Sequence, residues 1–466
     1  MRKFLIYFII SICSQALYAQ DDSATLNVEQ VLQIVRQYHP TVKQANLQIK
    51  KSDAEITIAR GAFNPIIGAI VSNKKLENVT YYDYTNPSLT LPTWFGIEVF
   101  AGIENLTGNR IDPSETTGES SYIGLSVPLL KNLIIDKRRA YLKQAKLYKD
   151  MAVVEQQAIV NNILMEAASK YWEWVNAYQS YKIVENNYEI SKQRFEMVKK
   201  TFQNGERPAI DTIEAMTQYQ TFEFQKNESW LRFLQQGLEL SVYLWQANDI
   251  PYQLPERIIP QQGWDNESNI QNFNPDLDQL LATAREFHPE LQLYDQKLAI
   301  LDTDKKLKFQ ELLPRLDFKY NRLSKDYYAY NSEGLWFQNN YQYGFKLEIP
   351  ALFSLGRGEY KKAKLNIEAT QIAQSQKSLT IDLKVKNYFN EFTTLKEQVK
   401  LQRSMLSNYE KLLKAEETLF QNGESSLFLI NARETKVLES QRKMIELKTY
   451  YYKTIYLLQW SAGMLK

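Results

Sequence analysis

Residues that commonly carry catalysis or bind metals are few in this sequence and lie far apart. The two histidines, His39 and His288, each precede a proline, and the single cysteine, Cys13, lies near the N-terminus. The segment 356–358 lacks the Gly-x-x-x-x-Gly-Lys-Ser/Thr spacing of a phosphate-binding loop, and no Ser–His–Asp or Cys–His set is discernible. The sequence therefore predicts no catalytic residue, no cofactor and no metal site, and a protein that is not an enzyme.

The composition excludes several classes of protein. The 466 residues are 44% hydrophobic and 24% charged, with 16 glycines and 14 prolines, which is unlike collagen, disulfide scaffolds or disordered chains. A mean hydropathy of −0.44 argues against a polytopic helical membrane protein. The formal net charge is +2, so we expect no nucleic-acid partner.

The first nineteen residues have the layout of a secretory signal. Arg2 and Lys3 precede an apolar run at 4–12, and Leu17-Tyr18-Ala19 ends it before a polar stretch. This pattern predicts a signal peptide at 1–19, cleaved near Ala19, and an exported protein. An amphipathic anchor and a lipidated Cys13 are the alternatives to this interpretation.

Two copies of one pattern follow the predicted signal. The dipeptide His39-Pro40 recurs as His288-Pro289, at an offset of 249 residues. The string Phe-Gln-Asn-Gly-Glu at 202–206 recurs without change at 420–424, at an offset of 218. The difference of 31 residues predicts an insertion in the first copy, between Pro65 and Ala145. An internal duplication of this kind indicates a repeat architecture.

Each copy has the same order of expected elements: a helical segment, a strand region, a very long helix, a short glycine-containing turn and a last helix. Four of the 14 prolines lie between the copies, which is typical of a connector. The expected boundaries are 20–247 for the first repeat, 248–275 for the connector and 276–466 for the second repeat. Within the repeats we expect strand regions at 64–128 and 314–350, and tip turns at 203–208 and 421–425.

The long helices, expected at about 136–202 and 357–420, carry apolar residues seven apart. Sustained heptad spacing predicts coiled-coil packing, and 67 helical residues would extend about 100 Å. An ordinary antiparallel bundle is the alternative, because its apolar stripe is similar. The first helix shows the spacing at Val160, Ala167, Trp174, Tyr181, Tyr188, Phe195 and Phe202.

The strand regions are rich in glycine and flanked by aromatic residues such as Trp94 and Trp336. Aromatic girdles mark the rims of membrane β-barrels, although ordinary loop aromatics are the alternative. A closed barrel of this kind needs at least eight strands, so the chain would have to oligomerise. Whether 93–104 forms a separate strand is left open. The candidate strands are 66–72, 94–103, 122–128, 315–323 and 336–349.

The repeat order and the two Phe-x-x-Gly turn strings resemble the TolC-type outer-membrane efflux and secretion channel family (outer membrane efflux protein). The resemblance covers essentially the whole mature chain. It implies a mainly α fold with a transmembrane β-barrel portion. A homotrimer would share a twelve-stranded β-barrel, four strands from each chain, and an α-barrel tunnel in the periplasm of a Gram-negative bacterium.

The resemblance also implies a function. The chain would be the passive exit duct of a tripartite efflux pump or a type I secretion system. Its partners would be a periplasmic adaptor (membrane fusion protein), an inner-membrane pump and outer-membrane lipid. A periplasmic coiled-coil adaptor or scaffold that spans no membrane is the alternative, and an exported enzyme is a third. The sequence does not predict the cargo.

The family's functional residues map onto the tip turns. The resemblance implies adaptor contacts at Gly205, Glu206, Gly423 and Glu424. It implies that Phe420 takes the place of a gating tyrosine without its hydroxyl. Ser425 replaces a gating arginine, while Leu429 and Ala432 replace two pore aspartates.

These departures lead to one hypothesis for the gate. Phe428 or Leu429 would form an apolar constriction, since such constrictions can close a pore by dewetting. Asp211 and Glu214 would supply acidic groups near the mouth. For Asp211, the alternative is stabilisation of the first turn of its helix through the helix dipole.

Overall fold

The computed structural model describes residues 25–265, 273–325, 327 and 337–466. The predicted signal peptide, Cys13 and Trp336 lie outside these residues. The chain divides into two compact units. Among the described residues, one unit contains 25–43, Ile159–Ala284 and Leu383–Lys466, and the other contains Gln44–Ala158 and Arg285–Asp382. Each unit therefore contains segments of both predicted repeats.

Each predicted repeat opens with two helices separated by the His–Pro step. Helix α2 (Val28–Tyr38) precedes α3 (Pro40–Gly61), and α7 (Leu277–Phe287) precedes α8 (Pro289–Gln310). The His39 ring Nδ1 accepts a hydrogen bond of 3.2 Å from the Thr41 backbone N–H, and His288 Nδ1 accepts one of 3.2 Å from Glu290. Each histidine therefore caps a helix that begins at a proline, a position where the missing N–H costs nothing.

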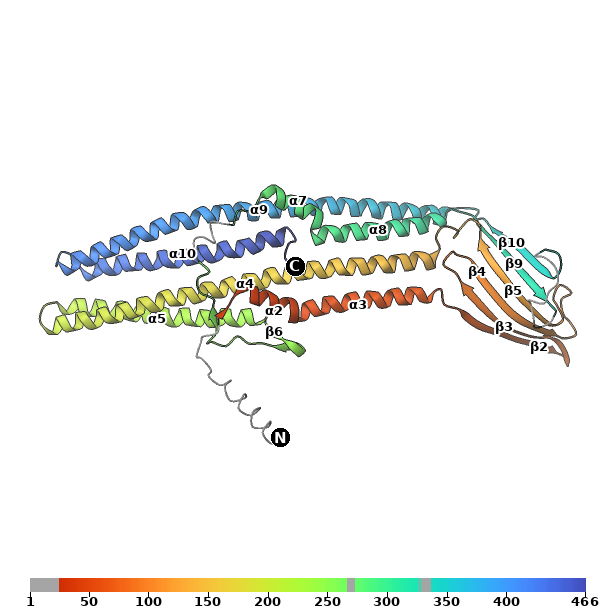
Figure 1. The fold of residues 1–466 in the computed structure, drawn as a ribbon, viewed down its shortest axis with the longest axis horizontal. Helices are drawn as coiled ribbons and strands as arrows, with labels where there is room; N and C mark the ends of the chain where they lie inside the picture. Colours follow the sequence, from red (N-terminus) through yellow and green to blue (C-terminus); the bar gives the residue numbers. More distant parts are fainter. Residues whose placement is uncertain (1–24, 266–272, 326, 328–336) are drawn as a thin grey trace, which may run out of the picture. The chain divides into compact units, whose positions relative to one another are not determined.

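Two very long helices and two shorter ones follow the strand regions of the two repeats (Figure 1). Helix α4 (Lys137–Gln203) has 67 residues and α9 (Ser354–Gln421) has 68, so each extends about 100 Å. Helices α5 (Ala209–Ser241) and α10 (Leu427–Ser461) follow them. Within the described ranges, no helix combines the length and the apolar character needed to cross a bilayer.

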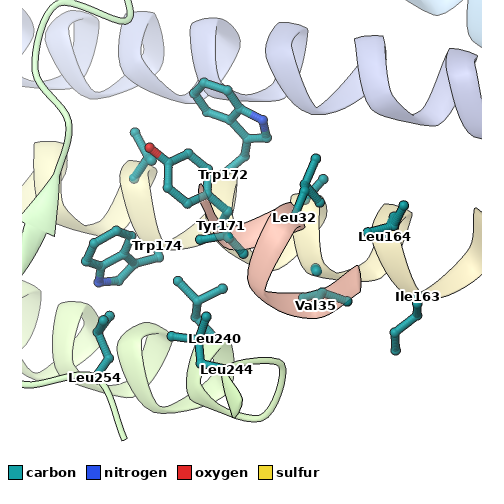
Figure 2. Packing of buried hydrophobic residues seen from close by; sticks show 14 of the residues in the cluster. Leu32, Val35, Ile163, Leu164, Tyr171, Trp172, Trp174, Leu240, Leu244 and Leu254 are labelled. Carbon is teal, nitrogen blue, oxygen red and sulfur yellow. The ribbon is translucent and has the colours of Figure 1, made fainter. Parts of the chain in front are cut away.

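The core of the first unit lies where α4 packs against α2 and α5 (Figure 2). Trp174 and Tyr171 of α4 have 0% and 2% of their surface exposed, and they pack with Leu32 of α2 and Leu240 of α5. The Trp174 ring stacks on Phe233 at 6.1 Å between centroids. Because Trp174 occupies a heptad position of α4, the seven-residue spacing places this core along one face of the helix.

The described residues of the connector contain short strands. Strand β6 (Trp245–Gln246) and the 3-10 turn η1 (Ala247–Asp249) precede β7 (Ile250–Pro251), which pairs with β6. Strand β8 (Ile259–Pro260) pairs in parallel with β1 (Thr25–Leu26). Beyond β8, the Trp264 ring lies 5.6 Å from Tyr452 of α10, and Lys448 forms a 3.0 Å ion pair with Asp265. These contacts fix this end of the connector to α10.

The second unit contains an antiparallel sheet of six strands in the order β10-β9-β5-β4-β3-β2 (Figure 1). The resemblance implied four strands per chain. That prediction is wrong for this sheet, which has six. The strands are β2 (Ile66–Leu76), β3 (Val79–Pro92), β4 (Glu98–Thr107), β5 (Gly118–Pro128), β9 (Arg315–Ser324) and β10 (Tyr341–Glu348).

Strand β3 is the one that the sequence pattern failed to predict. It contains Asn86 and Pro87 and ends at Pro92, and such residues indicate a turn more often than a strand. The segment 93–104, left open from sequence, belongs to a turn and a separate strand, β4. Gly96 makes this turn with a φ of 85°, and the Thr93 backbone N–H donates to the Ile97 carbonyl at 2.9 Å.

Candidate functional site

The turn between α4 and α5 is formed by the first copy of the repeated string. Gly205 has a φ of 79°, which is accessible to glycine at little cost. Its N–H donates to the Phe202 carbonyl at 2.9 Å, and the Glu206 N–H donates to the Thr201 carbonyl at 3.0 Å. This pair of hydrogen bonds is the Schellman motif, in which glycine ends a helix in the left-handed conformation.

The turn between α9 and α10 repeats this geometry. Gly423 has a φ of 78°, its N–H donates to Phe420 at 3.1 Å, and the Glu424 N–H donates to Leu419 at 2.9 Å. A Cβ at either turn glycine would meet no atom within 4 Å. The side chains of Glu206 and Glu424 are exposed. The repeated string thus specifies two open, identically capped turns.

Asp211, a predicted pore acid, is engaged in an ion pair within the first turn. Arg207 Nη1 lies 3.2 Å from Asp211 Oδ2, and the two side chains are 27% and 20% exposed. The Arg207 guanidinium also lies 3.9 Å from the centroid of the Phe420 ring, which belongs to the second repeat. Arg207 therefore links the two repeats through a cation–π contact.

Beneath this contact, an apolar cluster joins all four long helices near the turns. Val198 of α4, Ala215 of α5 and Leu427 of α10 are each at most 3% exposed. Phe195 and Phe420 pack against them and are partly buried. The structure thus places Phe420 in the packing between the helices, where its ring contacts Arg207 on one side.

Farther along the same helices, aromatic residues at heptad positions of α4 face α5. The Tyr181 ring lies 5.1 Å from Trp230, and Phe195 stacks on Tyr219 at 6.0 Å. The hydroxyls of Tyr188 and Tyr219 lie 3.3 Å apart, and this hydrogen bond raises the pKa of Tyr219 to about 12. The α4–α5 seam is therefore aromatic toward the turn, and Lys226 and Lys199 lie over its Tyr188 and Phe195 rings.

The remaining predicted gate residues divide into a paired acid and two exposed apolar side chains. Asn431 Nδ2 donates a 3.3 Å hydrogen bond to Glu214 Oε1, which joins α10 to α5. Phe428 is 68% exposed and Leu429 is 41% exposed, whereas the preceding Leu427 is buried. The structure therefore brings Asp211 and Phe420 together through Arg207, but Phe428 and Leu429 point away from that cluster.

Sequence reasoning missed a buried acid beside the second turn. Glu416 Oε1 accepts a 2.5 Å hydrogen bond from Ser425 Oγ, and Arg433 Nε lies 3.5 Å from Glu416 Oε2. The Glu416 side chain is only 11% exposed. The offset of 218 residues aligns Glu416 with Val198 of the first repeat. A charged residue at the repeat position of an apolar one was therefore the signal in the sequence.

The same offset aligns Ser425 with Arg207. The gating arginine that the resemblance implied at 425 is absent there, but an arginine occupies the equivalent position of the first repeat. It contacts Phe420, the residue in the place of the gating tyrosine. Comparison of the two turns within this chain would have identified Arg207.

A second missed residue pair connects α4 to α10. Arg194 Nη1 lies 2.7 Å from Glu434 Oε2, and Arg194 Nη2 lies 3.0 Å from Glu434 Oε1. The two side chains are 12% and 4% exposed. Two parallel N–H···O bonds give this pair strict geometry. It therefore fixes the register between helices of different repeats, about one turn of α4 before Val198 of the apolar cluster.

Comparison with known proteins identifies the family. The outer membrane efflux protein family matches residues 31–244, which include the first strand region, α4, the first turn and α5. The chain belongs to this family. No curated protein matches the sequence. The predicted family resemblance is confirmed, and the chain is an outer-membrane efflux channel of the TolC type rather than an enzyme.

Solved structures of outer-membrane channels share the fold of this efflux protein over nearly its whole length. The Campylobacter jejuni channel CmeC is 15% identical, with a TM-score of 0.64, over 94% of this chain and 86% of that one. CusC is 14% identical, with a TM-score of 0.67, over 97% and 95%. The open state of the Neisseria gonorrhoeae channel MtrE is 12% identical, with a TM-score of 0.63, over 94% and 89%.

These matches confirm the mainly helical fold with antiparallel strands, and the family confirms the outer membrane of Gram-negative bacteria as the location. The periplasmic adaptor or scaffold and the exported enzyme, the two alternatives from sequence, are not supported.

Proposed function

We propose that this efflux protein is the passive exit duct of a tripartite efflux pump or a type I secretion system. It would act as a homotrimer, as channels of this family do in known structures. A periplasmic adaptor and an inner-membrane pump would open its helical tip. The segment 1–19 would direct export, and the repeats 20–247 and 276–466 would each supply one helix-turn-helix tip.

The contact between Arg207 and Phe420 is the observation that best supports a gated tip. It joins the turn of one repeat to the last residues of α9 in the other, at a site where both turns are otherwise open. A cation–π contact of this kind contributes about 0.5–2 kcal/mol. That strength suits a contact which holds the tip closed and can be broken when a partner binds.

The exposed apolar residues after the second turn would form the constriction. Phe428 and Leu429 have large side chains exposed on α10, and three copies of such residues around an axis would exclude water. Asp211 would contribute less negative field than a free carboxylate, because the charge of Arg207 offsets it, whereas Glu214 has only the neutral amide of Asn431 beside it. We therefore expect weak cation preference rather than strong selectivity.

The adaptor would contact the two turns. Glu206 and Glu424 are exposed, and Gly205 and Gly423 leave the backbone accessible on the outside of each turn. A partner with donor groups could bind both turns in the same way, because their hydrogen-bond geometry is the same.

Single-channel recording tests the constriction. Leu429→Ser should raise the closed-state conductance of the purified protein in planar bilayers, because a hydroxyl lets water enter the narrow segment. Leu412→Ser is the matched control, since Leu412 of α9 is 45% exposed but lies away from the turn. An unchanged leak in Leu429→Ser, or an equal leak in both variants, would contradict the assignment of the gate.

The assembly has a separate test. Native mass measurement of protein extracted from outer membranes should give a trimer, and cysteine cross-linkers placed at Glu206 and Glu424 should capture the adaptor. Turn variants that capture nothing from cells expressing the whole pump would contradict the docking role. A monomer in detergent would contradict the proposed duct itself.

A further inference from the structure

The sheet contains more strands than the resemblance to the family implied. The first repeat contributes four of them, β2 to β5, and the second contributes β9 and β10. Strands β2, β4, β5 and β9 have 11, 10, 11 and 10 residues, which suits a tilted crossing of a bilayer. Each strand of the β2–β3 hairpin is therefore at least as long as the neighbouring strand β4.

One face of the sheet is apolar from β3 to β10. The register places five apolar residues side by side in one row across these strands, and Ile67 of β2 pairs with Leu89 of β3 on the same face. The row consists of Leu91, Val99, Leu125, Tyr320 and Tyr343. Membrane strands show this apolar face toward lipid, so the face includes the β2–β3 hairpin.

The opposite face is polar, and a hydrogen-bond network there ties β3 to its neighbours. Asn86 of β3 donates to Tyr84 at 2.6 Å and to Glu104 of β4 at 3.1 Å. Tyr122 of β5 lies 3.3 Å from Asn86 Oδ1, and its ring covers Gly102 of β4. Asn86 is only 7% exposed. Removal of β3 from the sheet would take these hydrogen-bond partners from Glu104 and Tyr122.

The two edges of the sheet are complementary in direction. Each of the five neighbouring pairs is antiparallel, so β2 and β10 run in opposite directions. Their outer side chains are exposed: Ile67 is 85% and Val71 is 72% exposed on β2, and Phe345 is 62% and Leu347 is 59% exposed on β10. Edge strands offer unpaired N–H and C=O groups, which lipid cannot satisfy.

We propose that β10 of one chain pairs with β2 of a second copy, so that three copies of six strands close one sheet of eighteen strands. This inference rests on the proposed trimer. It replaces the twelve strands that the resemblance implied, in which β10 would pair with β4 of the next copy. Closed sheets of sixteen to eighteen strands leave an open aqueous channel, so the outer-membrane part would not restrict the cargo.

Cysteine cross-linking distinguishes pairing of β10 with β2 of the next copy from pairing with β4 of the next copy. Phe345→Cys in β10 is combined with Ile67→Cys, Ala69→Cys or Val71→Cys in β2, which cover the stagger between copies. The matched set combines Phe345→Cys with Val99→Cys, Ala101→Cys or Ile103→Cys in β4. Within one chain β10 lies five strand spacings from β2 and three from β4, roughly 24 and 14 Å. Both distances exceed the reach of a disulfide, so any bond must join two copies.

The full-length protein is oxidised in outer membranes, and the native mass of the same detergent extract is measured. We expect reductant-sensitive covalent dimers and trimers with at least one β2 cysteine and none with the β4 set. Bonds to β4 alone would overturn the eighteen-stranded sheet and leave the trimer intact. Trimers that form no disulfide with either the β2 or the β4 cysteines would also overturn the proposed pairing of β10 with β2. A monomeric extract would instead overturn the proposed trimer.

Discussion

Removal of Glu434 should destabilise the packing of α10 against α4 by about 3–5 kcal/mol, because it leaves Arg194 charged in a buried site. The two side chains are 12% and 4% exposed and share two hydrogen bonds, of 2.7 and 3.0 Å. Unit charges about 4 Å apart interact by about 4 kcal/mol at an effective dielectric constant of 20. The Glu434→Leu variant loses this attraction, and water has little access to the arginine that remains.

The double variant Arg194→Met/Glu434→Leu should be close to the wild type in stability. Replacement of a buried ion pair by apolar residues is often neutral, since both desolvation costs disappear with the attraction. Hydrogen exchange followed by mass spectrometry resolves the peptides of α10 near residue 434. Since 1.4 kcal/mol corresponds to a factor of ten, a loss of about 3–5 kcal/mol should make these amides exchange about two to three and a half orders of magnitude faster in Glu434→Leu.

A surface pair provides the control for this measurement. Lys436 and Glu439 form a 2.8 Å ion pair on the same helix with side chains 57% and 59% exposed. Exposed pairs contribute little, so Glu439→Leu should leave the exchange rates near residue 434 unchanged. The reasoning is refuted if Glu434→Leu exchanges like the wild type, or if the double variant exchanges as fast as the single one.

Two further predictions follow from the caps. Gly205→Ala should cost about 1 kcal/mol through its positive φ alone, whereas Gly358→Ala, in the interior of α9 with open space around it, should be neutral or stabilising by up to about 1 kcal/mol. Hydrogen exchange of the peptides that contain each position checks this, and equal effects would contradict it. Burial lowers the pKa of His39 below 6.5, against a smaller opposing effect of a hydrogen bond with the Val242 backbone. The stability that the neutral ring contributes is therefore present above about pH 6.5 and is lost as the pH falls from there toward the lowered pKa. His39→Asn keeps a capping acceptor without a titrating group, so the melting temperature should fall less between pH 7 and pH 5 than in the wild type; identical pH profiles would contradict the role of the ring.

The helical part was predictable because its signals are local. The heptads of α4 and the two Phe-Gln-Asn-Gly-Glu strings specify packing and turn geometry within a few residues. Strand β3 was not predictable in this way, since Pro87 and Pro92 indicate a turn and the hydrogen bonds that hold the strand come from β2 and β4. The cross-repeat contacts of Arg207 and Arg194 were missed for a related reason. Their partners lie more than 200 residues away in the sequence.

Single-channel conductance of the purified mature protein in a planar lipid bilayer tests the central claim most directly. We expect discrete current steps with weak cation preference. The steps should be small for the wild type, because the tip is held closed, and larger for Leu429→Ser. The absence of steps from both proteins, under conditions in which each is inserted in the bilayer as a trimer, would contradict an efflux duct gated at its helical tip.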